Sequence, residues 1–197
     1  MKKAIILAIS MCLITAQATQ AFEKGYEKRV EAYAFAGLTD YYKSLFGVGM
    51  VNGWRMTPSI FVGVGTGFEY SNALYRTGLK DDQYCPQYMI PLYGEFKYNF
   101  RSHQKVSPYL LLDAGWVLNF GGEDDKDISK RSIYGLMASM RYGIDVKVGD
   151  QIRLFASAGP RFQHVRHTDR YPGTKGWEHH LIDKMLTTVC LHIGIIF

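Results

Sequence analysis

The sequence predicts an all-β fold, an eight-stranded antiparallel up-and-down barrel that spans a membrane. Three observations predict it. The chain ends on a strand of strict period-two alternation that closes with Phe197, about eight such segments follow one another, and their charged residues share one face while apolar residues occupy the other. Because an Arg or Lys on a lipid-facing position costs about 2–4 kcal/mol near the membrane midplane, the charged face is expected to line the interior.

Ahead of the barrel, residues 1–21 have the pattern of a secretory signal peptide. Lys2–Lys3 is followed by an uncharged apolar run and by small residues that suit cleavage after Ala18 or Ala21. The apolar run is too short to cross a bilayer as a helix. We therefore expect one mature domain, the barrel of residues 22–197.

The first three strands are expected near Tyr26–Gly37, Ser44–Trp54 and Ser59–Tyr70. The first two have the weaker apolar faces, in which Val, Ala, Phe and Met recur at every second position. The third strand places three glycines on the same side as Glu69, and interior glycines leave room for large side chains across a narrow barrel. These glycines are Gly63, Gly65 and Gly67.

The next three strands are expected near Tyr88–Phe100, Ser107–Phe120 and Ser132–Lys147. In the last two of these, aliphatic and aromatic residues alternate with charged or small ones. Pro91 lies inside the first of the three and cannot donate a ladder hydrogen bond. We therefore expect a bulge or a local irregularity there.

The last two strands are expected near Gln151–Gln163 and Met185–Phe197. Pro160 leads to the same expected irregularity in the seventh strand. In the eighth, every second residue from Met185 onward belongs to an almost wholly apolar side. A terminal aromatic on such a strand is typical of bacterial outer-membrane barrels, so we expect Phe197 to act as the C-terminal insertion signal.

Short and long connections alternate between these strands. Tight turns on the periplasmic side and freely growing loops on the outer side produce such an alternation, and an even strand number brings both termini to the periplasmic side. The short connections are Arg55–Pro58, Arg101–Val106 and Val148–Asp150, and the long polar ones are Ser71–Gln87, Gly121–Arg131 and His164–Lys184.

Aromatic residues recur near the expected strand ends. In a membrane barrel such residues form belts at the two membrane–water interfaces. The candidates are Trp54, Tyr70, Tyr88, Tyr98, Phe100, Trp116, Phe120, Tyr134 and Phe197.

Ten charged residues on the polar strand faces are the candidate functional residues. An eight-stranded barrel is just wide enough for side chains to fill its interior, so a plugged, charge-balanced lumen is expected, and a narrow ion path is the alternative. The residues are Glu31, Glu69, Glu95, Lys97, Asp113, Arg141, Asp145, Lys147, Arg153 and Arg161.

The overall composition excludes some functions. Without Lys2 and Lys3, 21 basic residues face 18 acidic ones, and this dispersed surplus does not indicate nucleic-acid binding. The mean hydropathy of −0.12 is what alternating apolar and polar residues produce in a membrane barrel. Cys85, in an expected loop, and Cys190, deep in the last strand, are not expected to pair.

The stretches Phe61–Gly67, Ile90–Phe100 and Val106–Leu110, the last leading to Asp113–Gly115, resemble the small outer-membrane barrel proteins with a porin-like or OmpA-like domain, particularly those of Bacteroidetes. The resemblance extends over essentially the whole mature chain. It implies this fold and a Gram-negative outer-membrane location. It implies no activity, because most such proteins have none assigned.

No catalytic residue, metal site or cofactor is expected. Ser71, Ser129 and Ser132 near the outer rim could act with a loop histidine, yet no motif of barrel enzymes that modify lipid A is visible. The last long connection holds metal-ligand residue types without a repeated tight spacing, so solvated histidines are expected there. These residues are His164, His167, Asp169, Glu178, His179, His180 and Asp183.

The sequence therefore predicts a non-enzymatic integral outer-membrane protein with a plugged lumen, long extracellular loops and a structural or surface-recognition role. The expected partners are outer-membrane lipid and lipopolysaccharide, the barrel-assembly machinery through the C-terminal strand, and an extracellular ligand of unknown identity. A narrow passive pore for small solutes or ions is the alternative. A soluble lipocalin-like barrel would need a polar outer face, which this alternation does not provide.

Overall fold

The structure is a computed structural model of the 197-residue chain. It describes residues 24–37, 42–76, 82–100, 102, 104–120, 134–149, 152–173 and 176–197, and along 42–44, 72–76, 82–86, 165–173 and 176–184 and at 134 this description is of the backbone. The expected signal peptide and the connection Gly121–Arg131 lie outside the described residues. Within them, no helix is long and apolar enough to cross a membrane.

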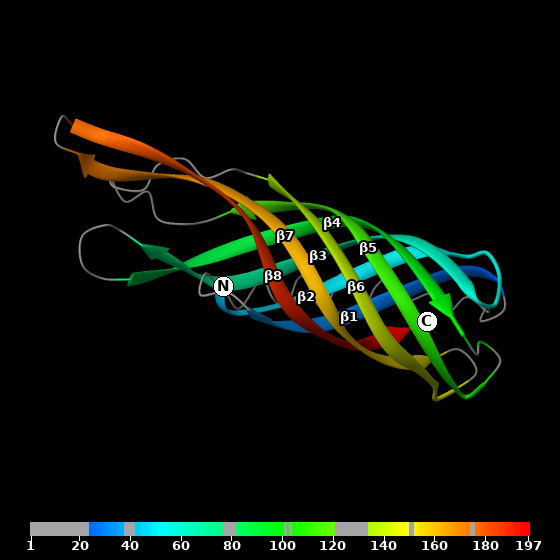
Figure 1. The fold of residues 1–197 in the computed structure, drawn as a ribbon. Coiled ribbons are helices and arrows are strands. Elements are labelled where there is room, and N and C mark those ends of the chain that lie inside the picture. Colours follow the sequence, from blue (N-terminus) through cyan, green and yellow to red (C-terminus); the bar gives the residue numbers. More distant parts are fainter. Residues whose placement is uncertain are drawn as a thin grey trace, which may run out of the picture.

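Eight antiparallel strands close on themselves into a barrel, as the sequence predicts (Figure 1). Each strand pairs with its neighbours in chain order, and β1 pairs with β8 to complete the ring. Closure removes the open sheet edges that could not be hydrogen-bonded in lipid. The strands are β1 (Gly25–Gly37), β2 (Tyr42–Arg55), β3 (Ile60–Arg76), β4 (Asp82–Asn99), β5 (Val106–Phe120), β6 (Tyr134–Lys147), β7 (Arg153–Gly173) and β8 (Gly176–Ile196).

The seam between β1 and β8 extends to the last residue of the chain. The Lys28 N–H donates to the Phe197 carbonyl (2.8 Å), and the Phe197 N–H donates to the Lys28 carbonyl (2.9 Å). Phe197 therefore adds two hydrogen bonds to the contact that closes the barrel. Its role as an insertion signal stays a prediction.

The two ends of the barrel differ. We call the end that holds Gly25 and Phe197 the turn end, because β2–β3, β4–β5 and β6–β7 are connected there. At the opposite end, called the hairpin end, β3 and β4 pair as far as Arg76 and Asp82, and β7 and β8 pair as far as Gly173 and Gly176. Figure 1 shows the β7–β8 ribbon, in orange and red-orange, reaching past the other strands.

Two segments predicted as long loops are therefore largely strand. Much of Ser71–Gln87 belongs to β3 and β4, and nearly all of His164–Lys184 belongs to β7 and β8. Cys85, predicted in a loop, lies in β4 opposite Ala73. The reason is that backbone pairing continues beyond the barrel wall, where a ribbon needs no apolar face. The period-two signal used for the prediction is then lost.

The two prolines interrupt the ladder without a bulge. The Asn99 N–H donates to the Ser59 carbonyl of the preceding segment (2.7 Å), so odd-numbered residues of β4, including Pro91, face β3. The β3–β4 pairing stops at Thr66–Leu92 and resumes in the same register at Glu69–Met89. Pro160 interrupts the β6–β7 pairing in the same way. The predicted irregularity is thus a local gap with no change of register.

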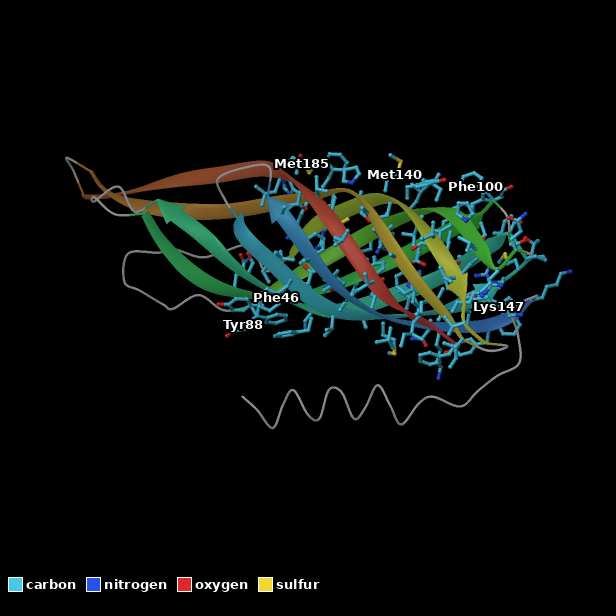
Figure 2. The ribbon with its side chains drawn as sticks, turned by 90° about the horizontal axis from the view of Figure 1, so that it is seen from below. Phe46, Tyr88, Phe100, Met140, Lys147 and Met185 are labelled. Atoms are coloured by element: carbon cyan, nitrogen blue, oxygen red, sulfur yellow. The ribbon has the colours of Figure 1, made fainter. Side chains whose placement is uncertain are left out.

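The barrel wall is apolar outside and polar inside, the reverse of a soluble protein. In β8, Leu191 is 59% exposed while the adjacent Cys190 is fully buried, and the same alternation recurs in β1, β5 and β6. Side chains cover this outer wall between the two ends, with Met140 on it (Figure 2). The outer surface therefore lacks the polar face that a soluble lipocalin-like barrel requires.

Aromatic residues gather on this wall toward both ends. At the hairpin end, Phe46, Tyr70, Tyr88 and Phe120 pair directly across β2, β3, β4 and β5, and the Tyr70 and Tyr88 rings are 5.5 Å apart. Toward the turn end lie Tyr26, Trp54, Tyr98, Phe100 and Tyr142, with ring contacts between Tyr26 and Trp54 (6.5 Å) and between Tyr98 and Phe100 (5.2 Å). In Figure 2, Phe46 and Tyr88 lie toward the side from which the hairpin ribbons extend, and Phe100 lies toward the opposite end. We call these two groups the hairpin-end belt and the turn-end belt.

Candidate functional site

The barrel interior brings together most of the charged residues singled out in the sequence. Strand alternation places every second residue inside, and the described residues include twelve buried charged ones, six acidic and six basic. They are Glu27, Glu31, Glu69, Glu95, Asp113 and Asp145 with Arg29, Arg55, Lys97, Arg141, Arg153 and Arg161. Nine of the ten predicted residues are in this set.

The layer nearest the turn end combines two ion pairs through an amide. Arg55 Nε donates to Glu27 Oε2 (2.7 Å), and Arg55 Nη1 donates to Asn99 Oδ1 (3.1 Å). Asn99 Nδ2 in turn donates to Asp145 Oδ2 (2.8 Å), and Lys97 Nζ donates to Asp145 Oδ1 (2.9 Å). The amide links β2, β4 and β6 across the interior, and Glu27 adds β1, so this layer connects four strands.

In the middle layer, two guanidinium groups share three carboxylates. Arg29 binds both oxygens of Glu95 through its two terminal nitrogens, and its Nε lies 3.3 Å from Glu31. Arg141 lies 2.6 Å from Asp113, 3.5 Å from Glu31 and 3.7 Å from Glu95. Each charge of this middle layer therefore has at least one opposite partner, which offsets part of the cost of removing it from water.

A third layer lies toward the hairpin end and contains one bidentate pair. Arg161 donates to both oxygens of Glu69, at 2.6 and 3.0 Å. Arg161 also donates to Gln163 (3.2 Å), and its guanidinium lies 4.6 Å from the centre of the Phe35 ring. Planar pairing of this kind holds both side chains in one orientation.

A histidine from β8 joins the middle layer. His192 Nδ1 lies 3.4 Å from Glu31 Oε2, and its ring stacks on Tyr33 at 4.7 Å between centres. Tyr93 donates to the other oxygen of Glu31 (3.0 Å). Glu31 therefore receives contacts from β1, β4, β6 and β8, and it is the most shared acid of the described interior.

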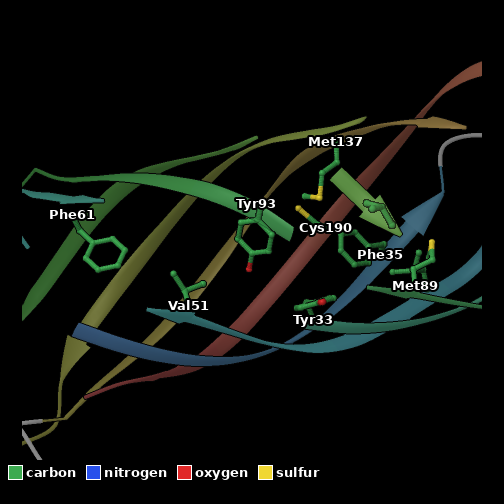
Figure 3. Close-up of a cluster of buried hydrophobic side chains, with 10 residues drawn as sticks. Tyr33, Phe35, Val51, Phe61, Met89, Tyr93, Met137 and Cys190 are labelled. Carbon is green, nitrogen blue, oxygen red and sulfur yellow. The ribbon is translucent and has the colours of Figure 1, made fainter. Parts of the chain in front are cut away.

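Two tyrosines fill the space that the interior glycines leave, as the sequence predicts. A Cβ on Gly65 would lie 2.3 Å from the Tyr93 ring, and one on Gly67 would lie 2.6 Å from the Tyr33 hydroxyl. Gly47 of β2 faces the same Tyr33 ring at 2.5 Å. Figure 3 shows Tyr33 and Tyr93 among the buried apolar side chains of the interior. Glycine is thus required at these positions by the close approach of the rings.

Little empty space remains around these groups. A cavity of about 10 Å³ lies between the middle layer and the Arg161–Glu69 pair, lined by Glu31, Tyr93 and His192 among others. A water molecule needs at least about 10–15 Å³. This part of the described interior therefore has room for about one water molecule.

Four interior residues are absent from the predicted set, and one predicted residue lies elsewhere. Glu27 and Arg29 have the same parity as Glu31, so the period-two rule could have found them, and His192 lies on the side of β8 opposite its apolar side. Arg55 belongs to a predicted turn, but in the structure it is the last residue of β2 and is buried. Lys147 is exposed, because β6 ends at this residue and the interior ends with it.

The residues considered for catalysis or metal binding are not assembled into a centre in the part of the chain with described side chains. Ser71 is buried, His164 is half-buried, and Ser129 and Ser132 lie outside the described residues. Among residues with described side chains, which exclude the outer part of the β7–β8 hairpin, no group of three His, Cys, Asp or Glu residues could hold a metal ion. Cys190 is a buried free thiol that donates to the Gly159 carbonyl (3.0 Å).

Known proteins share the fold of this chain but not its sequence. No protein-family model matches the chain, and no curated protein sequence matches it. Among solved structures, the outer membrane protein OprG from Pseudomonas aeruginosa has a TM-score of 0.62 at 11% identity, covering 88% of this chain and 95% of that one. Neisserial surface protein A (NspA) has a TM-score of 0.52 at 16% identity, covering 87% and 94%. At these identities the similarity establishes the barrel fold, and it gives no support to a narrower Bacteroidetes type.

Proposed function

We propose that this chain is an integral outer-membrane β-barrel with a closed interior, and that it acts through recognition at its hairpin end rather than through transport or catalysis. The observation that carries the proposal is the apolar wall between the hairpin-end belt and the turn-end belt. A wall of this kind is stable in a bilayer and would aggregate in water. The similarity to OprG and NspA, both described as outer-membrane or surface proteins, supports the location.

The proposed orientation has the turn end in the periplasm and the hairpin end outside the cell. Short turns on the periplasmic side and longer extracellular segments are the rule in outer-membrane barrels. The wall would contact outer-membrane lipid and lipopolysaccharide, and the C-terminal strand with Phe197 would bind the barrel-assembly machinery. The extracellular ligand would meet the β3–β4 and β7–β8 hairpins.

The layered ion pairs and the small cavity support a plug rather than the alternative of a narrow pore. The first test has two readings. Unheated and boiled samples of the outer-membrane fraction should migrate differently in SDS, because a closed barrel resists SDS until it is heated. The same protein in planar bilayers should give no stable conductance. A protein in the periplasmic fraction without a mobility shift contradicts the barrel assignment, and steady channel currents contradict the plug.

Orientation and recognition are tested on intact cells. The β7–β8 hairpin contains Arg166, Arg170 and Lys175, so trypsin added to intact cells should cleave there. Because His164 and Met185 are directly paired, residues 165–184 can be replaced by an Asn-Gly turn without disturbing the barrel register. Cells with this variant should lose adhesion to protein-coated surfaces or cell–cell aggregation. Unchanged adhesion and aggregation, with the heat-dependent mobility shift retained, would contradict a recognition role for this hairpin.

A further inference from the structure

The outer part of the β7–β8 ribbon aligns residues that are far apart in the sequence. Register is continuous from His164–Met185 to Gly173–Gly176, and this ribbon projects beyond the other strands in Figure 1. Among its successive pairs on one face are His167–Ile182, Asp169–His180 and Tyr171–Glu178. The backbone register thus determines which polar residues become neighbours.

Three residues of metal-ligand types occupy adjacent positions on that face. Asp169 is directly opposite His180, and His167 is two residues before Asp169 and diagonal to His180. Residues directly opposite each other have Cβ atoms about 4.5–5.5 Å apart, and diagonal neighbours are about 7–8 Å apart. Histidine and aspartate are residue types that supply ligands to Zn²⁺, with bond lengths of about 2.0–2.2 Å, and the register brings three of them to neighbouring positions.

The neighbouring histidine belongs to the other face. His179 is opposite Arg170, one position out of phase with the Asp169–His180 pair. Successive residues of a strand lie on opposite faces, so His179 and His180 cannot serve as an adjacent pair of donors on one face. This separation could not be read from the sequence, in which the two histidines are equivalent.

We propose that His167, Asp169 and His180 form a binding site for a divalent transition-metal ion on the β7–β8 hairpin, with Zn²⁺ as the best match. Two histidines and one carboxylate are a common donor set for Zn²⁺ sites that keep an open position for water or another ligand. The site lies outside the barrel wall, so it does not depend on the proposed orientation in the membrane.

The test uses the full mature chain, free of any affinity tag, purified in detergent and stripped of metal with EDTA. Calorimetric titration with ZnCl₂ should give saturable binding of about one ion per chain. His167→Ala, Asp169→Asn and His180→Ala should each weaken binding by tenfold or more, whereas the matched control His179→Ala should bind as the unchanged protein does. Acidification should also weaken binding, because the imidazoles must be deprotonated to act as donors.

Retention of the heat-dependent mobility shift in every variant shows that the barrel is folded, so that loss of binding reports on the site. The proposal is overturned if the unchanged protein shows no saturable Zn²⁺ binding. It is also overturned if His179→Ala loses as much affinity as His180→Ala, or if none of the three proposed donors alters binding. None of these outcomes bears on the membrane location, which the fractionation experiment tests separately.

Discussion

At the scale of single residues, the interior is defined by contacts between glycines and aromatic rings. The ring of Tyr93 lies over Gly65, and its hydroxyl is held by Glu31 at 3.0 Å. Because that hydrogen bond fixes the far end of the ring, the ring has little freedom to move away from a larger residue. A narrow barrel thus obtains its packing from pairs of very small and very large residues.

Gly65→Ala is therefore expected to destabilise the barrel by about 1–3 kcal/mol, the usual cost of overpacking. The matched control is Gly94→Ala, because the nearest atom to a Cβ on Gly94 is 3.9 Å away. Urea unfolding in phospholipid vesicles measures both. Equal stability of the two variants would show that the Tyr93 ring can move aside to make room for the added methyl group.

The buried ion pairs are expected to behave as units. Arg161→Met or Glu69→Gln alone leaves an uncompensated partner inside and should cost about 3–5 kcal/mol. The double variant should cost clearly less than the sum of the two single variants, and the double-mutant cycle from urea unfolding measures this coupling. Lys147→Met is the control and should stay within about 0.5 kcal/mol, because Lys147 is exposed. An additive double variant would mean that the pair is not coupled.

At the scale of elements, the sequence predicts those parts of strands that form the barrel wall. An apolar outer wall on one side and a packed polar interior on the other impose strict alternation, so the sequence predicts β1, β5 and β6 to within two residues at each end. The outer parts of β3, β4, β7 and β8, which extend into the hairpins, are not constrained on both faces in this way, and the sequence does not predict them as strands. The partners of the charges were also not predictable. Arg29 of β1 meets Glu95 of β4 across the lumen, and strand tilt and stagger determine that meeting.

Pro91 offers a test of how strand pairing is interrupted. Pro91→Ala supplies an N–H for the Gly67 carbonyl across the gap between β3 and β4, and one such hydrogen bond contributes about 0.5–1.5 kcal/mol. Amide hydrogen exchange at Gly67, which faces β4, should slow in this variant, and Pro160→Ala should have the same effect at Met140, which faces β7. Unchanged exchange would show that the gap has a cause other than the missing donor.

At the scale of the whole molecule, the barrel reverses the arrangement of a soluble protein, and the six acidic and six basic residues of its described interior balance each other. Neutrality matters because a net charge sealed inside a membrane-spanning wall would have no counterion. Lys147, outside the interior, indicates where charge becomes tolerable, since it is exposed at the turn end beyond the apolar wall. Whether a charged residue is buried or exposed therefore depends on its position along the barrel axis as well as on the strand face that it occupies.

An arginine on the outer wall should destabilise the protein according to its depth. Leu191 is 59% exposed and lies within the apolar stripe of β8, so Leu191→Arg should cost about 2–4 kcal/mol in phospholipid vesicles. Val148 is 62% exposed just past the end of β6, so Val148→Arg should cost about 0–1 kcal/mol. Both side chains already contact solvent or lipid, so neither change creates a cavity, and the difference between the two costs measures burial in lipid. If the two variants unfold at the same urea concentration, the wall around Leu191 is not embedded in a bilayer, and the membrane assignment is wrong.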